Sequence, residues 1–569
     1  MAKVIILSII FLLAFIIRVY NFTEIPAPHV DEISFGYSTY SLLKTGADEF
    51  GVSFPLILRS LGDNKLALYS YVTIPAVLLF GLNEFSMRLP STLLGLASIP
   101  LLYYFTFLYT KDKRVAVVSA LLLALLPWHI IFSRTANEVV LQLFLLLVTF
   151  AAWRVYLDSG STKSLIVTSV TAVLALISYY SSFIFLPATA VVFIFLYRKS
   201  IRKKAVIPLF FIFTVCAFVV VTQPLDRVNQ TSVFKHGEVE ALLQEALQEQ
   251  GNGGNTLISR ALYNKVTVAS SIIMRNVSNQ LTLDYLFLKG DPSYSRYSLP
   301  GQGPIYIGLL LFILAGIYFS IDKYLREKNI NLLFILAWAM LGLLPTAFSF
   351  ENTIQRSTIL LPPLMIFGAI GIIKFVDFAK ATGSKQILLY GAGTLLAAYS
   401  LLFFINAYFV RMARHEPWHR NGYMKETYES LQYFQSIYPR IIVTHSAPAE
   451  FLFYDKTDPR LAQKMLRQNS FTNEGGFITL SQLKSISFMP TDCPTEGKLS
   501  IVYVCKGAYV PFNSEILKVI RYPNDFPARI FLKFTETHIG NDQIGNRIHV
   551  MENTKKNPQI IPEDSGRDW

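Results

Sequence analysis

The chain has 569 residues, of which 52% are hydrophobic and 16% are charged, and its mean hydropathy is +0.41. Soluble domains carry about 25% charged residues, so this composition excludes an ordinary soluble protein and indicates a membrane protein. The formal net charge of +13 does not point to nucleic acid, because the Lys and Arg residues lie between apolar runs, where such charges set topology.

Long apolar stretches recur along the chain, and a transmembrane helix needs roughly 20 mostly apolar residues. About eleven such stretches predict a polytopic α-helical membrane protein. They lie at residues 4–20, 88–110, 115–132, 139–157, 164–180, 182–197, 205–222, 305–321, 330–348, 357–376 and 386–409. Because no small-residue cleavage site follows the first stretch, we expect an uncleaved span there rather than a removed signal peptide.

Clusters of Lys and Arg orient these spans. They lie at residues 111–114, 163, 198–204, 323–328 and 374–385. If the apolar stretch 66–82 does not cross the bilayer, all of them fall on the side of the N-terminus, which the positive-inside rule makes the cytoplasm. We therefore expect 66–82 to be a surface or partly inserted helix. The loops expected outside the cytoplasm are 21–87, 133–138, 223–304 and 349–356, together with the chain after residue 410.

The first outer loop carries two adjacent carboxylates, Asp31 and Glu32, shortly after the first span. A helix start explains them without any function, because acidic residues in a first turn interact favourably with the helix dipole. A carboxylate here can instead accept a proton from an attacking hydroxyl group. Further along, Lys65 and Arg88 each suit either an interface anchor or a phosphate ligand.

Two short outer loops add further charges at span ends. The loop 133–138 carries Arg134 and Glu138, and Arg356 ends the loop 349–356. Ionisable residues at membrane depth indicate function, although at a span end solvation at the interface explains them as well. The candidate set is Lys65, Arg88, Arg134 and Arg356 with Asp31, Glu32 and Glu138. Cations for a phosphate and a carboxylate base suit group transfer from a lipid-linked phosphate donor.

Short motifs in a fixed order resemble the membrane glycosyltransferases of the GT-C fold. They are Asp31-Glu32, Thr45-Gly46, Lys65, Phe80-Gly81, Arg88-Leu89-Pro90-Ser91, Ser133-Arg134 with Glu138, Asp284 to Asp291 with Arg296, and Gln355-Arg356-Ser357 with Pro362-Pro363. The resemblance covers nearly the whole chain. It is strongest to the prokaryotic branch of the protein O-mannosyltransferase and aminoarabinose-transferase group (family 39-like), although Ser357 stands where an aromatic residue is more usual.

The resemblance implies a polyprenyl-phosphate sugar donor and an inverting transfer to an extracytoplasmic acceptor, which is a protein, a lipid or an envelope glycan. By position, Asp31 takes the place of the general base and Glu138 that of the second acidic residue. Lys65 and the arginines would neutralise the departing lipid phosphate. Asp291 and Arg296 of the long loop would bind donor or acceptor, or hold the loop in position. A divalent cation stays open as a cofactor, and no cluster in the sequence requires a metal.

Three regions follow from these patterns. Residues 1–410 are expected to form the membrane domain, 411–552 a small extracytoplasmic α/β domain, and 553–569 a disordered tail. In the α/β domain we expect strands at 440–444, 500–505, 516–520 and 530–534 and a helix at 428–434. Cys493 and Cys505 can pair there if the compartment is oxidising. The long loop is expected to hold a helix near 238–247 and a flexible linker at 251–255.

Other function classes compete with a glycosyltransferase of the plasma membrane. A transporter or flippase of lipid-linked sugars would show internal repeats and charges at mid-span, and the sequence shows neither clearly. An oligosaccharide ligase would need an outer cavity large enough for a preformed glycan. A receptor without activity would not need Asp31.

Overall fold

A computed structural model describes most of the chain. The residues outside the description are 1, 61–62, 202, 223–231, 235–236, 250–260, 292–296, 350–352, 382–385, 416, 418–421, 446–447, 473–477, 508 and 536–569. The predicted linker at 251–255 and the predicted disordered tail at 553–569 therefore lie outside the described residues.

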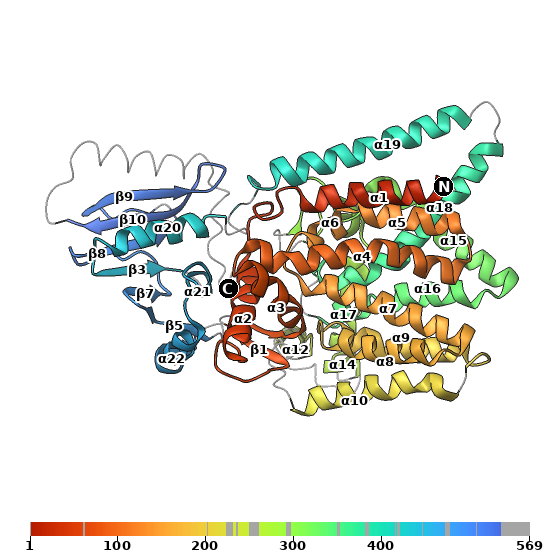
Figure 1. Cartoon of the computed structure of the whole chain (residues 1–569), viewed down its shortest axis with the longest axis horizontal. Coiled ribbons are helices and arrows are strands. Elements are labelled where there is room, and N and C mark those ends of the chain that lie inside the picture. The colour runs from red at the N-terminus through yellow and green to blue at the C-terminus, as the bar shows by residue number, and fades with distance from the viewer. Residues whose placement is uncertain are drawn as a thin grey trace. The chain divides into compact units, whose positions relative to one another are not determined.

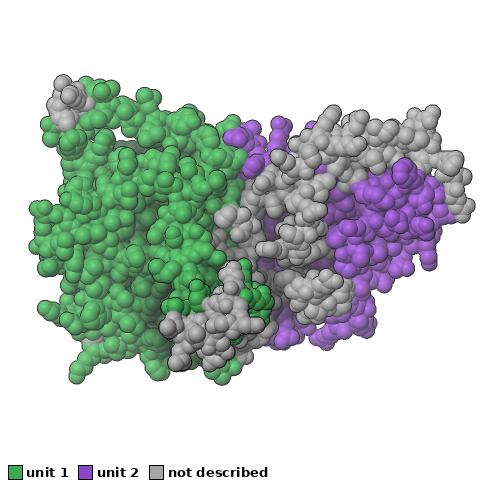
Figure 2. Space-filling view, turned by 180° about the vertical axis from the view of Figure 1, so that it is seen from behind, with its two compact units in different colours: residues 1–20, 91–408 green, residues 21–90, 409–569 purple. Residues whose placement is uncertain are grey.

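The chain divides into two compact units, which Figure 2 colours green and purple. Unit 1 comprises residues 1–20 and 91–408, and unit 2 comprises residues 21–90 and 409–569. The first long loop thus groups with the C-terminal residues, whereas the sequence placed it in a membrane domain of residues 1–410. That predicted boundary stays a prediction.

Unit 1 is a bundle of apolar helices that run side by side (Figure 1). They are α1 (Ala2–Val19), most of α4 (Glu84–Thr110), α5 (Lys113–Leu125), α6 (Pro127–Ser133), α7 (Glu138–Ser159), α8 (Thr162–Leu176), α9 (Ser182–Tyr197), α10 (Ile207–Thr222), α15 (Leu310–Glu327), α16 (Ile330–Leu341), α17 (Leu344–Ala347), α18 (Leu361–Ala381) and α19 (Gln386–Asn406). Two more helices, α12 (Glu238–Glu249) and α14 (Lys265–Gln280), lie between α10 and α15 along the chain.

Helices occur at all eleven predicted spans, and the protein is a multi-pass membrane protein. Among the described residues, six helices are long and apolar enough to cross a membrane, or seven if the bent pair α5 and α6 counts as one span. Several of the others, including α8 and α9, are apolar but shorter. The number of eleven spans therefore stays a prediction, although the polytopic helical fold is confirmed.

Glycines let two of these helices approach closely. A Cβ atom on Gly316 of α15 would lie 1.8 Å from the carbonyl oxygen of Phe367 on α18, and one on Gly371 would lie 1.9 Å from that of Phe312. No residue with a side chain fits at either position. Small residues at helix contacts are the usual way to pack helices where lipid gives no hydrophobic driving force.

The span formed by α5 and α6 is broken at Leu126, where the two helices bend by 58°. Pro127 has no N–H group, so carbonyls at the end of α5 lose their helical partner. Arg18 of α1 replaces it: its guanidinium donates to the carbonyl of Ala124 at 2.9 Å and lies 2.8 Å from Nδ1 of His129. A cation inside the bundle thus stabilises the break that leads into the loop 133–138.

Unit 2 begins with the segment between α1 and the middle of α4. It contains α2 (Val30–Thr45), a hairpin of β1 (Ile57–Ser60) and β2 (Asp63–Leu66), and α3 (Leu68–Phe80). The helix α3 occupies the stretch 66–82 that was predicted to lie on or partly in the membrane. With 13 residues it is about 20 Å long, which is less than the roughly 30 Å hydrocarbon core.

The C-terminal part of unit 2 is an α/β fold. Its six-stranded sheet has the order β6-β7-β3-β8-β10-β9, in which β3 pairs in parallel with β7 and β8. The strands are β3 (Arg440–Thr444), β6 (Gln482–Leu483), β7 (Ile486–Met489), β8 (Ile501–Lys506), β9 (Ser514–Arg521) and β10 (Pro527–Phe534). A small second sheet pairs β4 (Ser470–Thr472) with β5 (Ile478–Leu480). The helices are α20 (Met424–Gln435), α21 (Pro448–Tyr454) and α22 (Pro459–Asn469).

This fold confirms the four predicted strands and the predicted helix, and it answers the question of the cysteines. Cys493 and Cys505 form a disulfide in the core of the sheet, next to Ile530 and Val510. Such bonds persist in oxidising compartments, so the pairing is consistent with an extracytoplasmic domain.

Candidate functional site

The carboxylates predicted at the start of the first loop stand at the start of α2. His29 is the N-cap residue: its Nδ1 accepts the backbone N–H of Asp31 at 3.1 Å, and Glu32 reaches back to the backbone N–H of His29 at 3.1 Å. This capping box satisfies two helix N–H groups that would otherwise lack partners. The helix-start interpretation is therefore correct, and the surroundings of each carboxylate decide what else it does.

Asp31 is partly exposed and lies beside the ammonium group of Lys65. Its carboxylate accepts a hydrogen bond from the Lys65 ammonium at 3.1 Å, and 37% of the Asp31 side chain is open to solvent. Lys65 comes from β2, and its ammonium group also lies 4.7 Å from the centre of the Phe35 ring on α2. The structure thus brings together two of the predicted residues and leaves the carboxylate accessible.

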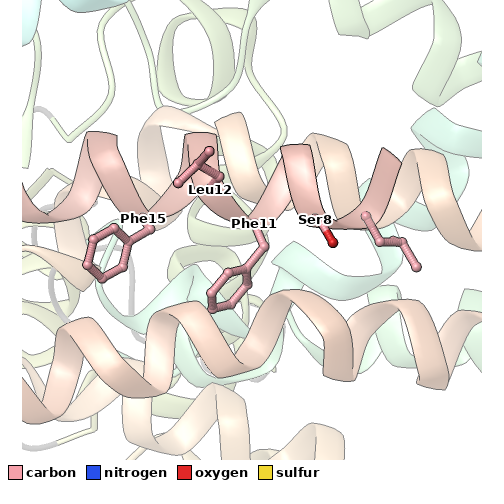
Figure 3. Close-up of a pocket in the computed structure, with 5 residues that line it drawn as sticks. Ser8, Phe11, Leu12 and Phe15 are labelled. Atoms are coloured by element: carbon pink, nitrogen blue, oxygen red, sulfur yellow. The ribbon is translucent and has the colours of Figure 1, made fainter. Parts of the chain in front are cut away.

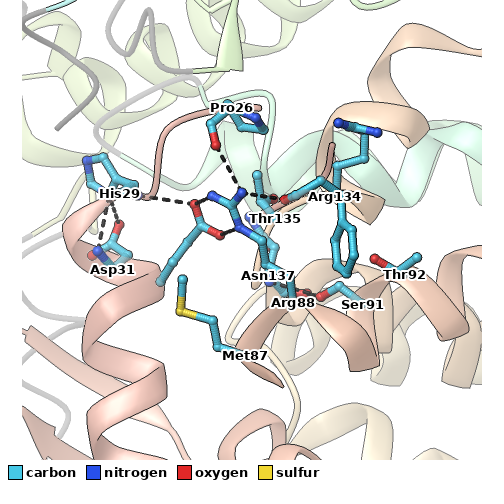
Figure 4. A network of polar contacts seen from close by, with 12 residues as sticks. Pro26, His29, Asp31, Met87, Arg88, Ser91, Thr92, Arg134, Thr135 and Asn137 are labelled. Atoms are coloured by element: carbon cyan, nitrogen blue, oxygen red, sulfur yellow. Dashed lines mark hydrogen bonds and ion pairs between the residues drawn. The ribbon is translucent and has the colours of Figure 1, made fainter. Parts of the chain in front are cut away.

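Glu32 has the opposite surroundings. Only 2% of it is exposed, and both its oxygens accept hydrogen bonds from Arg88, at 2.7 Å from Nε and 2.9 Å from Nη2. The remaining donor of Arg88 bonds the carbonyls of Phe22 and Pro26 at 2.7 and 2.9 Å. This bidentate pair ties the start of α2 and the chain before it to the first turns of α4 (Figure 4).

In unit 1, the guanidinium group of Arg134 is likewise hydrogen-bonded to neighbouring groups of the protein. Its side chain is fully buried, and its guanidinium bonds the carbonyl of Ile17, the carbonyl of Tyr20 at 2.7 Å and the hydroxyl of Tyr408 at 3.1 Å. These carbonyls lie at the C-terminal end of α1, where helix carbonyls lack partners. Arg134 therefore supplies hydrogen-bond donors to carbonyl groups at the C-terminal end of α1.

The residue between Arg134 and Glu138 that sequence reasoning missed is Asn137. Its side-chain oxygen caps α7 by accepting from Val139 N at 3.2 Å, and the same amide bonds the hydroxyl of Tyr297 and the side chain of Gln355, each at 3.2 Å. Its backbone exchanges hydrogen bonds with Ser91 of α4. Asn137 thus joins three loops of unit 1 and holds Glu138, which is partly exposed, in the first turn of α7.

The late loop and the long loop also meet in unit 1. Asp291 is 5% exposed, and its carboxylate accepts the backbone N–H of Ile354 at 3.2 Å. Arg356 is partly exposed and donates to the hydroxyl of Ser349. Asp291 therefore has the loop-holding role that the sequence allowed, whereas Arg296 lies outside the described residues.

A cluster of buried polar side chains around Ser357 was not predicted from the sequence. The Ser357 hydroxyl lies 2.9 Å from that of Tyr285, 3.0 Å from that of Thr346 and 3.1 Å from the Gln280 amide oxygen. Burial, and then the neighbouring Asp291 carboxylate, raise the pKa of Tyr285, so this phenol stays protonated. The signal in the sequence was Ser357 itself, the position noted above as a departure from the expected motif.

A groove in unit 1 lies along the first helix, away from the charged residues described above. A groove of about 400 Å³ follows α1 and is lined by Leu7, Ser8, Phe11, Leu12 and Phe15 (Figure 3). None of these five lining residues is titratable. Within the described ranges, no three His, Cys, Asp or Glu residues lie together as metal ligands would.

Comparison with known proteins places this geometry in context. The family model for dolichyl-phosphate-mannose-protein mannosyltransferase matches residues 8–226, which include Asp31, Lys65 and Glu138. No curated protein matches the chain in sequence. Among solved structures, apo ArnT from Cupriavidus metallidurans is 11% identical with a TM-score of 0.50, and the match covers 93% of this chain and 97% of that one. The fold is that of the GT-C membrane glycosyltransferases.

Two further structures resemble the chain less closely. ArnT bound to undecaprenyl phosphate has a TM-score of 0.49 at 11% identity and covers 95% of this chain and 99% of its own. The oligosaccharyltransferase AglB from Archaeoglobus fulgidus, in complex with an inhibitory peptide and a dolichol-phosphate, has a TM-score of 0.45 at 14% identity and covers 79% of this chain. The chain matches 63% of the length of AglB. The GT-C fold predicted from the motifs is thus confirmed by ArnT.

Proposed function

We propose that the protein is a glycosyltransferase that moves a sugar from a polyprenyl-phosphate donor to an acceptor hydroxyl group, with inversion at the anomeric carbon. The observation that carries this proposal is the partly exposed carboxylate of Asp31 beside the Lys65 ammonium. The match of residues 8–226 to a family named for a dolichyl-phosphate-mannose donor supports the class of donor.

Asp31 is the proposed general base. Its partly exposed carboxylate takes the proton of the acceptor hydroxyl group while the hydroxyl oxygen attacks the anomeric carbon of the sugar. The bond between the anomeric carbon and the phosphate oxygen breaks on the opposite side, and the lipid phosphate leaves with the electron pair. A positioned base contributes typically about 10²- to 10⁴-fold to such a step.

The proposed phosphate ligands are Lys65 and Arg356, both of which were predicted for this role. Negative charge grows on the phosphate as it leaves, and cations already in place stabilise that charge. Arg88 and Arg134 were predicted for the same role, but their donors are bonded to Glu32, to Tyr408 and to backbone carbonyls. We therefore assign these two arginines to holding the backbone.

The remaining candidates have supporting roles in the proposal. Glu138 is the second acidic residue and orients the acceptor, and Asn137 holds it in place. Glu32 positions its neighbour Asp31 through the pair with Arg88. Asp291 and the undescribed Arg296 belong to the loop that contacts donor or acceptor.

We further propose that the N-terminus is cytoplasmic and that unit 2 faces the outside. The positions of the Lys and Arg clusters support this orientation, and the disulfide of Cys493 and Cys505 agrees with it. The acceptor is then a protein, a lipid or a glycan of the cell envelope, and the donor is used from the outer leaflet.

The test is sugar transfer by the purified full-length protein in liposomes. Radiolabelled polyprenyl-phosphate hexoses are offered with an envelope extract, and the wild type is compared with Asp31→Asn. We expect the variant to lose at least about 100-fold of the transfer rate, as removal of a general base does. The matched control is Glu24→Gln, which neutralises an exposed carboxylate of the same segment whose side chain contacts Asn21.

Three other outcomes would contradict this proposal, and each indicates a different mechanism or function. Equal transfer by Asp31→Asn and wild type would remove Asp31 from the mechanism and leave Glu138 as the candidate base. Movement of the labelled lipid between leaflets without transfer would make the protein a flippase. Transfer only from lipid-linked oligosaccharides would make it a ligase.

A further inference from the structure

The C-terminal fold and the helix that carries Asp31 belong to the same compact unit, although contacting residues such as Tyr37 and Thr457 lie 420 positions apart in the sequence. The contact centres on Gly36 of α2. A Cβ atom at this position would lie 2.6 Å from Cε2 of Phe453 on α21 and 3.4 Å from Sδ of Met87. The Phe453 ring therefore lies directly on the backbone of α2.

Gly36 stands one helical turn after Glu32, so the ring contacts the face of α2 that carries the buried ion pair. Met87, the third partner in this contact, directly precedes Arg88, which forms that pair. The aromatic ring of the C-terminal fold, the glycine and the salt bridge thus form one continuous packed layer. Both Phe453 and Met87 are buried.

Polar contacts attach the C-terminal fold to α2 at further points. The buried hydroxyl of Tyr37 donates to the carbonyl of Thr457 at 3.0 Å. At the C-terminal end of α2, the amide of Gln463 on α22 donates to the hydroxyl of Thr45 at 3.1 Å and, just beyond the helix, to the carbonyl of Asp48 at 2.8 Å. The Asp455 carboxylate accepts from the hydroxyl of Thr457 and from the Lys484 ammonium at 2.6 Å, so the Thr457 anchor is itself held.

The close approach of the Phe453 ring accounts for a glycine at this position of α2. Gly36 does not have the positive φ that would require glycine. In a helix interior, glycine costs about 0.5–1 kcal/mol relative to alanine. The sequence carries that cost at a position where a methyl group would meet the Phe453 ring.

We propose that α21 positions the catalytic helix, and that the contact of Phe453 with Gly36 fixes the place of the Asp31 carboxylate. The proposal rests on the proposed function, because it makes Phe453 a positioning residue for a base. Reacting groups must stand within a fraction of an ångström of their productive geometry, and a shift of about 1 Å can cost about 100-fold in rate. The C-terminal fold is then part of the catalytic apparatus.

Paired substitutions test the contact. Gly36→Ala forces the ring and the helix apart, and Phe453→Leu in the same chain makes room for the added methyl group. We expect Gly36→Ala to lower kcat about 10-fold or more with donor KM changed less than about 2-fold, since the base moves but the donor contacts stay. The double variant should return to within about 3-fold of wild type.

Two control variants separate positioning from general damage. Gly391→Ala adds a methyl group to the helix α19 at a position where no atom of a neighbouring segment lies within 4 Å of the new Cβ. Phe512→Leu replaces an aromatic side chain that is 86% exposed with a smaller one. Both should keep wild-type kcat. Thermal unfolding of each variant is recorded, and a loss of kcat that follows the unfolding temperature and is not rescued in the double variant would overturn the proposal.

A second measurement does not need activity. In a Cys216→Ser background, which removes the described free thiol, Asp31→Cys is labelled with a charged maleimide. Gly36→Ala should change the labelling rate several-fold, and Phe453→Leu should restore it. Unchanged labelling in Gly36→Ala contradicts the proposal even if no sugar transfer is found, whereas an inactive wild type with rescued labelling contradicts only the proposed function.

Discussion

Two helices of this protein begin in the same way and are held in different ways. The helix α2 starts with a capping residue, His29, and carries Asp31 and Glu32 in its first turn; α7 starts with Asn137 and carries Glu138. The start of α2 is held by charge, through Arg88 and Lys65. The Asn137 cap of α7 is held by neutral hydrogen bonds from three other segments.

The difference teaches that a local sequence signal does not decide the environment of a carboxylate. Buried charge pairs are strongly coupled, because removing one partner leaves an uncompensated charge in a low-dielectric region. A neutral network loses one hydrogen bond at a time, at about 1 kcal/mol each. We expect the two helix starts to respond very differently to matched substitutions.

The largest effect is expected for Glu32→Gln, which keeps the shape of the side chain and removes its charge. Arg88 is then left buried without a carboxylate, and the variant should lose about 3–5 kcal/mol of unfolding free energy. Denaturant or thermal unfolding in detergent measures the loss. The matched substitution Glu138→Gln at the start of α7 should cost less than about 1 kcal/mol. Equal losses of unfolding free energy in the two variants would contradict the difference between the two helix starts.

A second prediction concerns how the unfolding free energy depends on pH, through a buried carboxyl group of unit 2. Burial raises the pKa of Glu450 on α21 from 4.5 to about 8, against the opposing effect of Arg529. The folded protein then keeps a proton that the unfolded chain has released. Stability contributed by this group is fully present below pH 4.5, falls by about 1.4 kcal/mol per pH unit above it, and stops falling near the folded pKa of about 8.

Glu450→Gln should flatten this slope, because the amide does not titrate. The measurement is the unfolding free energy across that pH window, in the wild type and in the variant. Tyr423 and Tyr454 also interact electrostatically with Glu450, but burial raises the pKa of both phenols, so they stay protonated throughout. A wild-type slope that persists in Glu450→Gln would assign it to another group.

Smaller effects are expected when the capping residue of either helix is replaced. Asn137→Ala removes the cap of α7 and its contacts with Tyr297 and Gln355, and should cost about 1–2 kcal/mol. Transfer activity should fall with it, since Glu138 follows directly. His29→Ala, the matched change at α2, should cost about 1 kcal/mol because the Glu32–Arg88 pair still holds the helix. A larger loss at His29 would show that the cap, and not the charge pair, holds α2.

The sequence by itself determined the elements that depend on local composition and period. Apolar runs placed helices at all eleven predicted spans, short buried runs marked strands of the C-terminal sheet, and the ordered motifs identified the GT-C fold. These signals survive without tertiary information, because lipid and backbone hydrogen bonding demand them of any chain that crosses a membrane. The sequence also singled out the charged residues at the span ends as one candidate set, because such residues are few, and their joint role stays a prediction.

Only the tertiary structure decided which of those charges stay accessible. Asp31 and Glu32 are neighbours in sequence, yet one lies partly exposed beside Lys65 and the other is sealed against Arg88, because adjacent residues on a helix point about 100° apart and meet different partners. The buried guanidinium of Arg134 and the contact of Gly36 with Phe453 depend on segments that are distant in the chain. No periodic pattern records such partners, so the residues that position the site became visible only in the folded protein.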